Sequence, residues 1–372
     1  MTEQLPVAEL LPVLEATGAW AGPAVWVPVL IWTLLALPLS AALRFSPWPP
    51  SLRYRLQQAL LAALPASLVA GAWIDLSALG ALLAGWPAAP PSVGTVVLSD
   101  AVALSSGATA ASGWGWSWTH ALGLLTVAAV AASGVQALRL ARSAVALIRL
   151  HDTLPHPAGG APNTLAPSKL AQQMAGELAE ALALRRPVRV RCTSAAMVPM
   201  TYGLLRPTIV VPAALADRPE ALRMTLMHEL VHIRRFDVLA RWVEQAVVVA
   251  AAIHPGVWWL TRVIERTREM ACDAEALRRT RSSRKAYADL IYGFSASATQ
   301  RAAFAVSIAE TSSMLKERIQ AMMTIDRSNA QPRRHVPWIA GALLLAITLS
   351  VVACSDSITP GASVEPGPAQ TS

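Results

Sequence analysis

The sequence predicts a polytopic α-helical membrane protein, with about four spans, that also carries a cytoplasmic α+β domain. Hydrophobic residues make up 54% of the chain and charged residues only 15%, whereas a soluble globular chain carries about a quarter charged residues. The apolar residues gather in a few long stretches, and the basic residues lie between those stretches. One long segment, residues 139–335, has the mixed polarity of a folded domain. These observations define the expected fold class.

Four apolar stretches without Lys or Arg each have roughly 18 or more residues, enough for a helix to cross a hydrocarbon core of ~30 Å. We place the spans at residues 23–43, 56–74, 120–138 and 336–353. The second stretch continues in apolar sequence past Asp75, so we end its span near Trp73. The expected organisation is a membrane region with three spans at 1–138, a cytoplasmic domain at 139–335, the fourth span, and a short external tail at 354–372.

The distribution of basic residues predicts the orientation of these spans. All 31 Lys and Arg residues fall within 44–55 and 139–334, and none lies in 1–43, 87–118 or 354–372. By the positive-inside rule, the segments rich in Lys and Arg stay in the cytoplasm. We therefore expect a multi-pass protein of a bacterial inner (plasma) membrane, in contact with the lipid bilayer, with both termini outside. The net charge of +8 follows from this topology, so direct nucleic-acid binding is not expected.

Helix and strand patterns alternate along the cytoplasmic segment and predict an α+β domain. The predicted elements before its central motif are a helix at 168–184 and strands at 187–193, 198–202 and 208–211. In the first strand, Val188, Val190 and Cys192 alternate with Arg189 and Arg191, which is typical of a half-buried strand. The two later strands are separated by a turn, and the first of these two is expected to lie at the sheet edge.

A further helix is expected to follow Asp217, which is placed to act as its N-cap. Pro219 lies in the first turn, Glu220 comes three residues after the cap, and the helix runs to about Arg235. Its apolar residues recur at helical spacing and predict a stripe that faces the core. They are Leu222, Leu226, Leu230 and Ile233.

This helix contains the central motif, His228-Glu229-Leu230-Val231-His232. Residues i and i+4 project from one face of a helix, so both imidazoles can reach a single metal ion. Glu229 is offset by one position and is placed to act as general base on the attacking water. The motif therefore predicts a Zn²⁺ site with His228 and His232 as ligands.

A catalytic zinc site normally takes a third protein ligand. The preferred candidate is Glu269, on a second predicted helix, and Glu265, one turn earlier, is the competing ligand. Asp273 lies one turn beyond Glu269 on the same face, where a carboxylate can orient a ligand histidine. Cys272 is interpreted as a small buried side chain.

Beyond this motif, the sequence resembles the BlaR/MecR-type antirepressor membrane metallopeptidases. The resemblance rests on GLLRPTIVVP, HELVHIRRFD, IHPGVWW and RTREMACDAEAL, and it is close over about 203–277. It implies a gluzincin-like domain in which His228, His232 and Glu269 bind zinc and Glu229 is catalytic. The best-known members carry a large extracellular penicillin-binding domain after the last span. Here only residues 354–372 follow, without the Ser-x-x-Lys or Lys-Thr-Gly signatures, so direct β-lactam sensing is not expected.

The predicted function is that of a membrane-bound zinc endopeptidase that cleaves a cytoplasmic or membrane regulatory protein in signal transduction. By the family resemblance, the protein substrate would be a regulator such as a transcriptional repressor. The edge strand at 198–202 would be placed to hold an extended substrate by strand addition. Two alternatives stay open, a constitutive quality-control protease for membrane proteins and a non-catalytic membrane scaffold.

The apolar segment 238–260 is not predicted to cross the membrane. It contains Arg241, Glu244 and the helix-interrupting His254-Pro255, and a single crossing would put Glu269 on the opposite side from the motif histidines. We expect a hairpin on the cytoplasmic side, either buried in the domain or dipping into the lipid. We interpret His254 as structural or interfacial rather than as a ligand.

The end of the predicted fourth span, Val351-Val352-Ala353-Cys354, resembles a lipobox that follows a basic flank and an apolar core. One hypothesis is that Cys354 is lipidated at the outer face. The alternative is that Cys354 is a small residue at a helix end.

Overall fold

The computed structural model describes residues 7–73, 117–153, 165–193, 198–299 and 312–324. The chain divides into two compact units. One unit holds residues 1–36, 63–131 and 344–372, and the other holds residues 37–62 and 132–343. The second unit contains every residue that the central motif and its expected partners involve.

The long apolar helices of the described chain lie within its first 153 residues. They are α1 (Val7–Ala21), the π-helical turn η1 (Gly22–Trp26), α2 (Val27–Phe45), α3 (Pro50–Trp73) and α6 (Trp118–Thr153). Two continuous helical stretches, Leu10–Phe45 and Trp118–Ala146, are long and apolar enough to cross a membrane. They contain the predicted spans 23–43 and 120–138.

The other two predicted spans differ in their outcome. Residues 56–73 of the predicted span 56–74 are helical and belong to α3. However, α3 is not among the described helices that are long and apolar enough to cross a membrane. Span 336–353 and Cys354 lie outside the described residues. The span count and the orientation therefore stay predictions.

In the first unit, α1 and α6 cross at two glycines. A Cβ atom added to Gly18 would lie 1.8 Å from the carbonyl oxygen of Thr119, and one added to Gly123 would lie 2.1 Å from that of Leu14. Only glycine allows backbones to approach so closely, and small residues serve this purpose at helix crossings in membranes.

The second unit contains a three-stranded sheet of order β1-β3-β2, built from β1 (Arg189–Thr193), β2 (Met200–Tyr202) and β3 (Thr208–Pro212). β1 pairs with β3 in parallel, and β2 pairs with β3 antiparallel. The predicted edge position of the strand at 198–202 is confirmed, because β2 pairs with β3 and lies at the end of this order.

The predicted alternation in β1 is wrong in part. Arg191 is buried, at 5% exposure, while Cys192 is only half-buried. Successive strand residues point to opposite faces of a sheet, yet Val210 and Val211 of β3 are both fully buried. Both faces are thus covered at this point, and Arg191, which pairs in register with Val210, shares the covered second face.

The motif helix α8 (Pro219–Arg235) begins one residue later than predicted. Its N-cap is Arg218, without a side-chain capping hydrogen bond, so the predicted Asp217 cap is wrong. The reason is Pro219, which fixes the first helical position and excludes the residue before it from the helical region. The helix ends at Phe236, in the left-handed conformation with φ of 60°, whose N–H donates to the carbonyls of His232 and Ile233.

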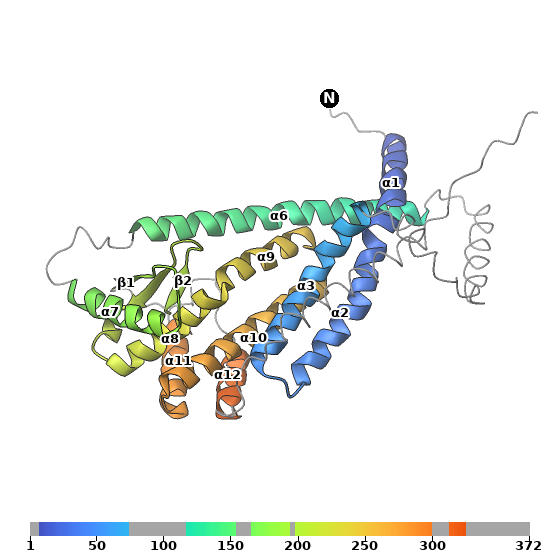
Figure 1. Ribbon diagram of the computed structural model, residues 1–372. Helices are drawn as coiled ribbons and strands as arrows, with labels where there is room; N and C mark the ends of the chain where they lie inside the picture. The colour runs from blue at the N-terminus through green and yellow to red at the C-terminus, as the bar shows by residue number, and fades with distance from the viewer. Residues whose placement is uncertain (1–6, 74–116, 154–164, 194–197, 300–311, 325–372) are drawn as a thin grey trace, which may run out of the picture. The chain divides into compact units, whose positions relative to one another are not determined.

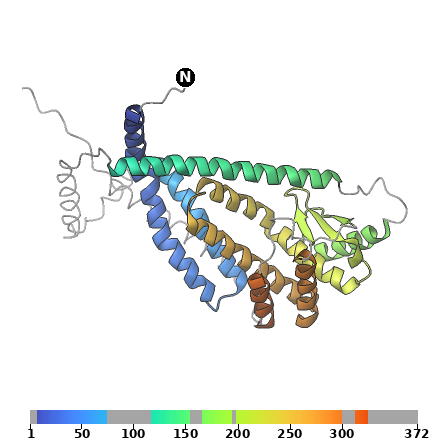
Figure 2. The same cartoon turned by 180° about the vertical axis from the view of Figure 1, so that it is seen from behind.

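Five more described helices belong to this unit, together with the 3₁₀ turn η2 (Ala213–Leu215). They are α7 (Leu165–Ala181), which overlaps the predicted helix at 168–184, α9 (Asp237–Ala250), α10 (Pro255–Thr280), α11 (Arg284–Thr299) and α12 (Ser312–Thr324). Figures 1 and 2 show α9 and α10 as the two arms of a hairpin. The hairpin predicted over 238–260 is therefore present. His254 caps the start of α10 by accepting a hydrogen bond from the Val257 N–H, which is a structural role.

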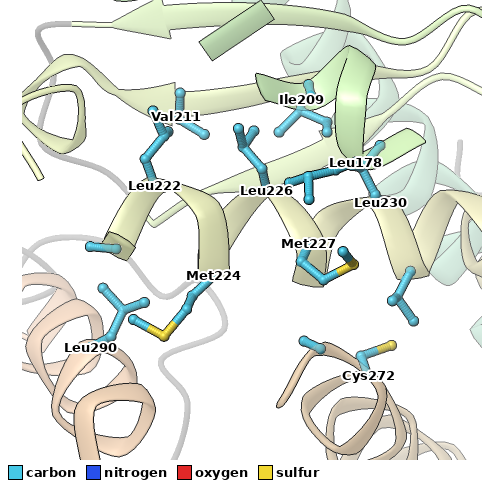
Figure 3. Close-up of a cluster of buried hydrophobic side chains, with 14 of the residues drawn as sticks. Leu178, Ile209, Val211, Leu222, Met224, Leu226, Met227, Leu230, Cys272 and Leu290 are labelled. Carbon is cyan, nitrogen blue, oxygen red and sulfur yellow. The ribbon is translucent and has the colours of Figure 1, made fainter. Parts of the chain in front are cut away.

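The central position of α8 is clear from its buried side chains (Figure 3). Leu222 and Leu226 point toward the sheet, where Val211 and Ile209 lie. Met224 points the opposite way, toward α11. Full burial of such a leucine stabilises the fold by roughly 1.5–3 kcal/mol. The predicted apolar stripe is confirmed, and the motif helix is held from two sides.

Candidate metal centre

Three predicted ligands come together at the interface of α8 and α10. His228 Nε2 lies 3.1 Å from His232 Nε2, and Glu269 places one carboxylate oxygen 3.4 Å from the first nitrogen and the other 3.8 Å from the second. The helical spacing aligns the two imidazoles, and α10 packs against α8 so that Glu269 faces them. The side chains are 12–20% exposed, which leaves the cluster accessible from one side.

This geometry fits a zinc ion. Two nitrogens that bind zinc at about 2.0–2.1 Å with a tetrahedral angle lie roughly 3.3 Å apart, close to the 3.1 Å separation of the two imidazole nitrogens. Ligand atoms of His228, His232 and Glu269 all lie within 4.8 Å of one another. Two imidazoles and one carboxylate are also a donor set typical of catalytic zinc.

The competing candidate Glu265 lies elsewhere. Its carboxylate pairs with Arg241 of α9 at 2.5 Å, and about a third of its side chain is exposed. Glu265 is not part of the described cluster that could hold a metal. The structure therefore favours Glu269 over Glu265 as the third ligand.

His228 is supported from behind by Asp273. The carboxylate of Asp273, fully buried on α10, lies 3.1 Å from His228 Nδ1, as predicted for a carboxylate that orients a ligand histidine. Tyr287 of α11 adds its hydroxyl 3.0 Å from the same nitrogen. Arg318 of α12 donates two hydrogen bonds of 2.9 Å to the Asp273 carboxylate. The imidazole is thus held by a network from three helices.

His232 has a separate support. Its Nδ1 lies 2.8 Å from Asp237 Oδ2, at the start of α9. The other oxygen of Asp237 accepts a hydrogen bond of 2.9 Å from the hydroxyl of Tyr54 on α3. Arg235 approaches the same oxygen at 3.8 Å. Each histidine therefore keeps Nε2 toward the cluster because a buried carboxylate holds its Nδ1.

A cavity of about 360 Å³ opens at this cluster, a size typical of ligand-binding pockets. The edge strand lines it with Met200 and Thr201, and the motif helix contributes Glu229. Glu229 is 7% exposed, and one of its carboxylate oxygens accepts a 2.6 Å hydrogen bond from the Thr201 hydroxyl. The acidic group predicted as general base thus lies beside the cluster and at the cavity wall.

Comparison with known proteins finds a peptidase family over this part of the chain. Residues 161–322 match the BlaR1 peptidase M56 family. The chain is also 25% identical over 168 residues to the regulatory protein BlaR1 of Bacillus licheniformis, which covers 45% of this chain and 27% of that protein. The part of the chain at residues 161–322 is thus similar to the peptidase domain of the BlaR1/MecR-type family. The match confirms the predicted resemblance and implies that the M56 domain is a metallopeptidase. The chain spans about a quarter of the length of this curated relative.

The charged groups of the M56 site favour an ionised Glu269 and a protonated His228. Burial opposes ionisation of Glu269, but the hydrogen bond from His228 and the charges of His232 and Arg318 hold the pKa of Glu269 well below its usual range. Burial likewise disfavours protonated His228, yet hydrogen bonds and charges from Asp273 and Glu269 outweigh it and raise the pKa of His228 to about 10. A metal ion that binds here must displace that proton.

Several side chains of the M56 site were not found by sequence reasoning. Asp237 lies within HELVHIRRFD, five positions after His232 in a run that the resemblance already included, so a local signal existed. Tyr54, Tyr287 and Arg318 come from segments far from the motif, and no local pattern marks them.

Proposed function

We propose that the chain is a membrane-bound zinc endopeptidase that cleaves a cytoplasmic or membrane regulatory protein. The observation that carries the proposal is the meeting of His228, His232 and Glu269 beside a cavity that also contains Glu229. The match of residues 161–322 to the M56 family and two described helical stretches long and apolar enough to span a membrane support the membrane metallopeptidase part.

In this proposal, His228, His232 and Glu269 hold the zinc ion. Zinc, when bound, polarises a scissile carbonyl and acidifies water. Glu229 takes a proton from the attacking water and delivers it to the leaving amine. Thr201 orients the Glu229 carboxylate through its hydrogen bond, so this acidic group is already fixed before the substrate enters.

The edge strand β2 supports the assignment of a peptide substrate. β2 pairs with β3 on one side only in the described sheet, and Met200 and Thr201 line the cavity. An extended peptide that adds to this edge would make main-chain hydrogen bonds and pass beside Glu229. Backbone pairing of this kind suits a protein substrate, because it does not depend on one particular side chain.

The regulatory role rests on the likeness to a relative named as a regulatory protein. By that likeness, we propose a cytoplasmic regulator, such as a transcriptional repressor, as the substrate. A constitutive quality-control protease is the alternative, and it would have many substrates. A scaffold without activity is the other alternative, and Glu229→Gln separates it from both enzymes.

The test compares a wild-type strain with one that carries Glu229→Gln at the native locus. We expect the variant protein to keep its zinc, because Glu229 is not a ligand, and to lose cleavage, because an amide cannot accept the proton of water. New protein N-termini are measured in both strains by mass spectrometry. One regulator cleaved only in the wild type supports the proposal. Many unrelated membrane proteins would favour quality control, and identical profiles would favour the scaffold.

A further inference from the structure

The tip of the α9–α10 hairpin carries no charged side chain. Between Glu244 on α9 and Arg262 on α10, residues 245–261 contain no Asp, Glu, Lys or Arg. At 1.5 Å per residue, α9 extends about 9 Å beyond Glu244 and α10 begins about 10 Å before Arg262. The uncharged parts of α9 and α10 thus have similar lengths. Glu244 and Arg262, the charged residues that border these parts, mark the base of the hairpin.

One face of α9 is apolar and open. Leu239, Trp242 and Val243 are 45–49% exposed, and Ala246 and Ala250 continue this exposed row at helical spacing toward the tip. A soluble domain normally buries such a continuous face, and where one is left exposed it marks an interaction site. Trp242 lies near the charged base, where an indole is favoured at a membrane interface.

The hairpin tip packs against a candidate membrane span. A Cβ atom added to Gly256, in the first turn of α10, would lie 2.5 Å from Leu37 Cδ1 of α2. Leu37 belongs to the apolar helical stretch Leu10–Phe45. Glycine at this position lets α10 approach α2 closely, so the tip lies at the level of Leu37.

A second contact sets the level of the base. Arg44 of α2 and Arg266 of α10 both reach Glu317 Oε1, at 2.9 and 3.4 Å. With the Leu37–Gly256 contact, this means that α2 and α10 run side by side in the same direction. Leu37 lies about 10 Å along α2 from Arg44, and Gly256 lies about 15 Å along α10 from Arg266. Two separate helices therefore place the tip about 10–15 Å beyond the level at which Arg44 and Arg266 meet Glu317.

We propose that residues 245–261 of the α9–α10 hairpin insert into the cytoplasmic leaflet beside α2, to a depth of about 10 Å, without crossing the bilayer. Lipid covers the inserted part of the exposed α9 face, at Ala246 and Ala250, and Trp242 and Val243 lie at the level of the headgroups. The arms are too short to cross a core of ~30 Å, and the charged base remains at the headgroups. Glu269 lies about 10 Å along α10 beyond Arg262, so the metal centre opens just below the membrane surface.

Site-directed spin labelling of the full chain in lipid nanodiscs tests this placement. Ala250→Cys carries the probe, in a background with Cys192→Ser and Cys354→Ser, where Cys272 is fully buried. Leu30→Cys, at a position 58% exposed on the apolar stretch of α2, is the lipid reference. Glu220→Cys, at an exposed position on the first turn of α8, is the water reference. Collision with oxygen, which concentrates in lipid, is compared with collision with a polar nickel chelate.

We expect the oxygen-to-nickel ratio at Ala250→Cys to exceed the Glu220→Cys reference several-fold and to lie below the Leu30→Cys reference, because Leu30 lies about 21 Å along α2 from Arg44 and this ratio rises with depth in the bilayer. A ratio equal to that at Glu220→Cys would mean that the tip lies in water and would overturn the proposal. Low collision with both reagents would also overturn it, because it would place the tip in a protein interface. The measurement uses neither zinc nor peptide cleavage, so its failure is distinct from failure of the proposed enzyme.

Discussion

Tyr54 provides the sharpest test of how the proposed metal centre is supported, because its hydroxyl group connects α3, through Asp237, to the proposed ligand His232. Tyr54 is 3% exposed, and its hydroxyl donates to Asp237, whose other oxygen holds His232. The same hydroxyl accepts hydrogen bonds from Gln58 at 2.8 Å and from Arg268 at 3.3 Å. Replacing Tyr54 with Phe removes these three hydrogen bonds together.

The substitution Tyr54→Phe isolates the hydroxyl group, since it keeps the ring. The guanidinium groups of Arg235 and Arg268 lie over that ring, at 4.4 and 5.6 Å from its centroid, and both contacts remain. A hydrogen bond to a charged group contributes about 1.5–3 kcal/mol, so we expect a comparable loss of folding stability. Removing a group that orients a metal ligand typically weakens metal affinity about 10–100-fold. We expect about tenfold here, because Arg235 still approaches Asp237.

Zinc affinity is measured on detergent-purified protein by competition with a chromophoric chelator, and Tm is measured with and without zinc. Tyr292→Phe is the matched control, since Tyr292 lies on α11 and is 62% exposed. We expect the control to keep wild-type affinity and Tm. If Tyr54→Phe behaves like the control in both measurements, the connection from Tyr54 through Asp237 to His232 does not support the metal centre.

Three further predictions follow from the same contacts. Wild-type protein should retain about one zinc per chain by elemental analysis, Glu269→Ala should lose most of it, and Glu265→Ala should keep it; the reverse result would refute the ligand assignment. Since the pKa of His228 is raised to about 10 in the metal-free site, a proton competes with zinc below that pH. Apparent zinc affinity should therefore rise with pH toward 10, by about tenfold per unit if one proton is displaced, and a flat chelator titration between pH 6 and 9 would contradict this. Leu226→Ala, at a fully buried position on α8, should cost roughly 2–5 kcal/mol of folding stability, measured by thermal unfolding, and a change below 1 kcal/mol would argue against the core position of α8.

Local features could be predicted well because they depend on neighbours in the chain. The i, i+4 spacing of His228 and His232 places both imidazoles on one face of any helix, and the leucine stripe shows which face of that helix enters the core. The two errors were also local. The cap at Asp217 was displaced by Pro219, whose ring restricts the residue before it. Arg191 was expected to be exposed, but both faces of the sheet are covered at its neighbour Val210.

By itself, the sequence determined the motif, the helix that carries it, the apolar stretches and the hairpin at 238–260, because each depends on periodicity or composition within one segment. Only the tertiary structure decided which glutamate joins the histidines. Glu265 and Glu269 both lie on α10 one turn apart, and the rotation of that helix, together with the pairing of Glu265 with Arg241, turns Glu269 toward the site. Tyr54 and Asp237 are 183 positions apart in the sequence, and their hydrogen bond supports His232. Only the tertiary structure brings these two residues together. Such contacts arise from how whole helices pack, and no pattern within a single segment encodes that packing.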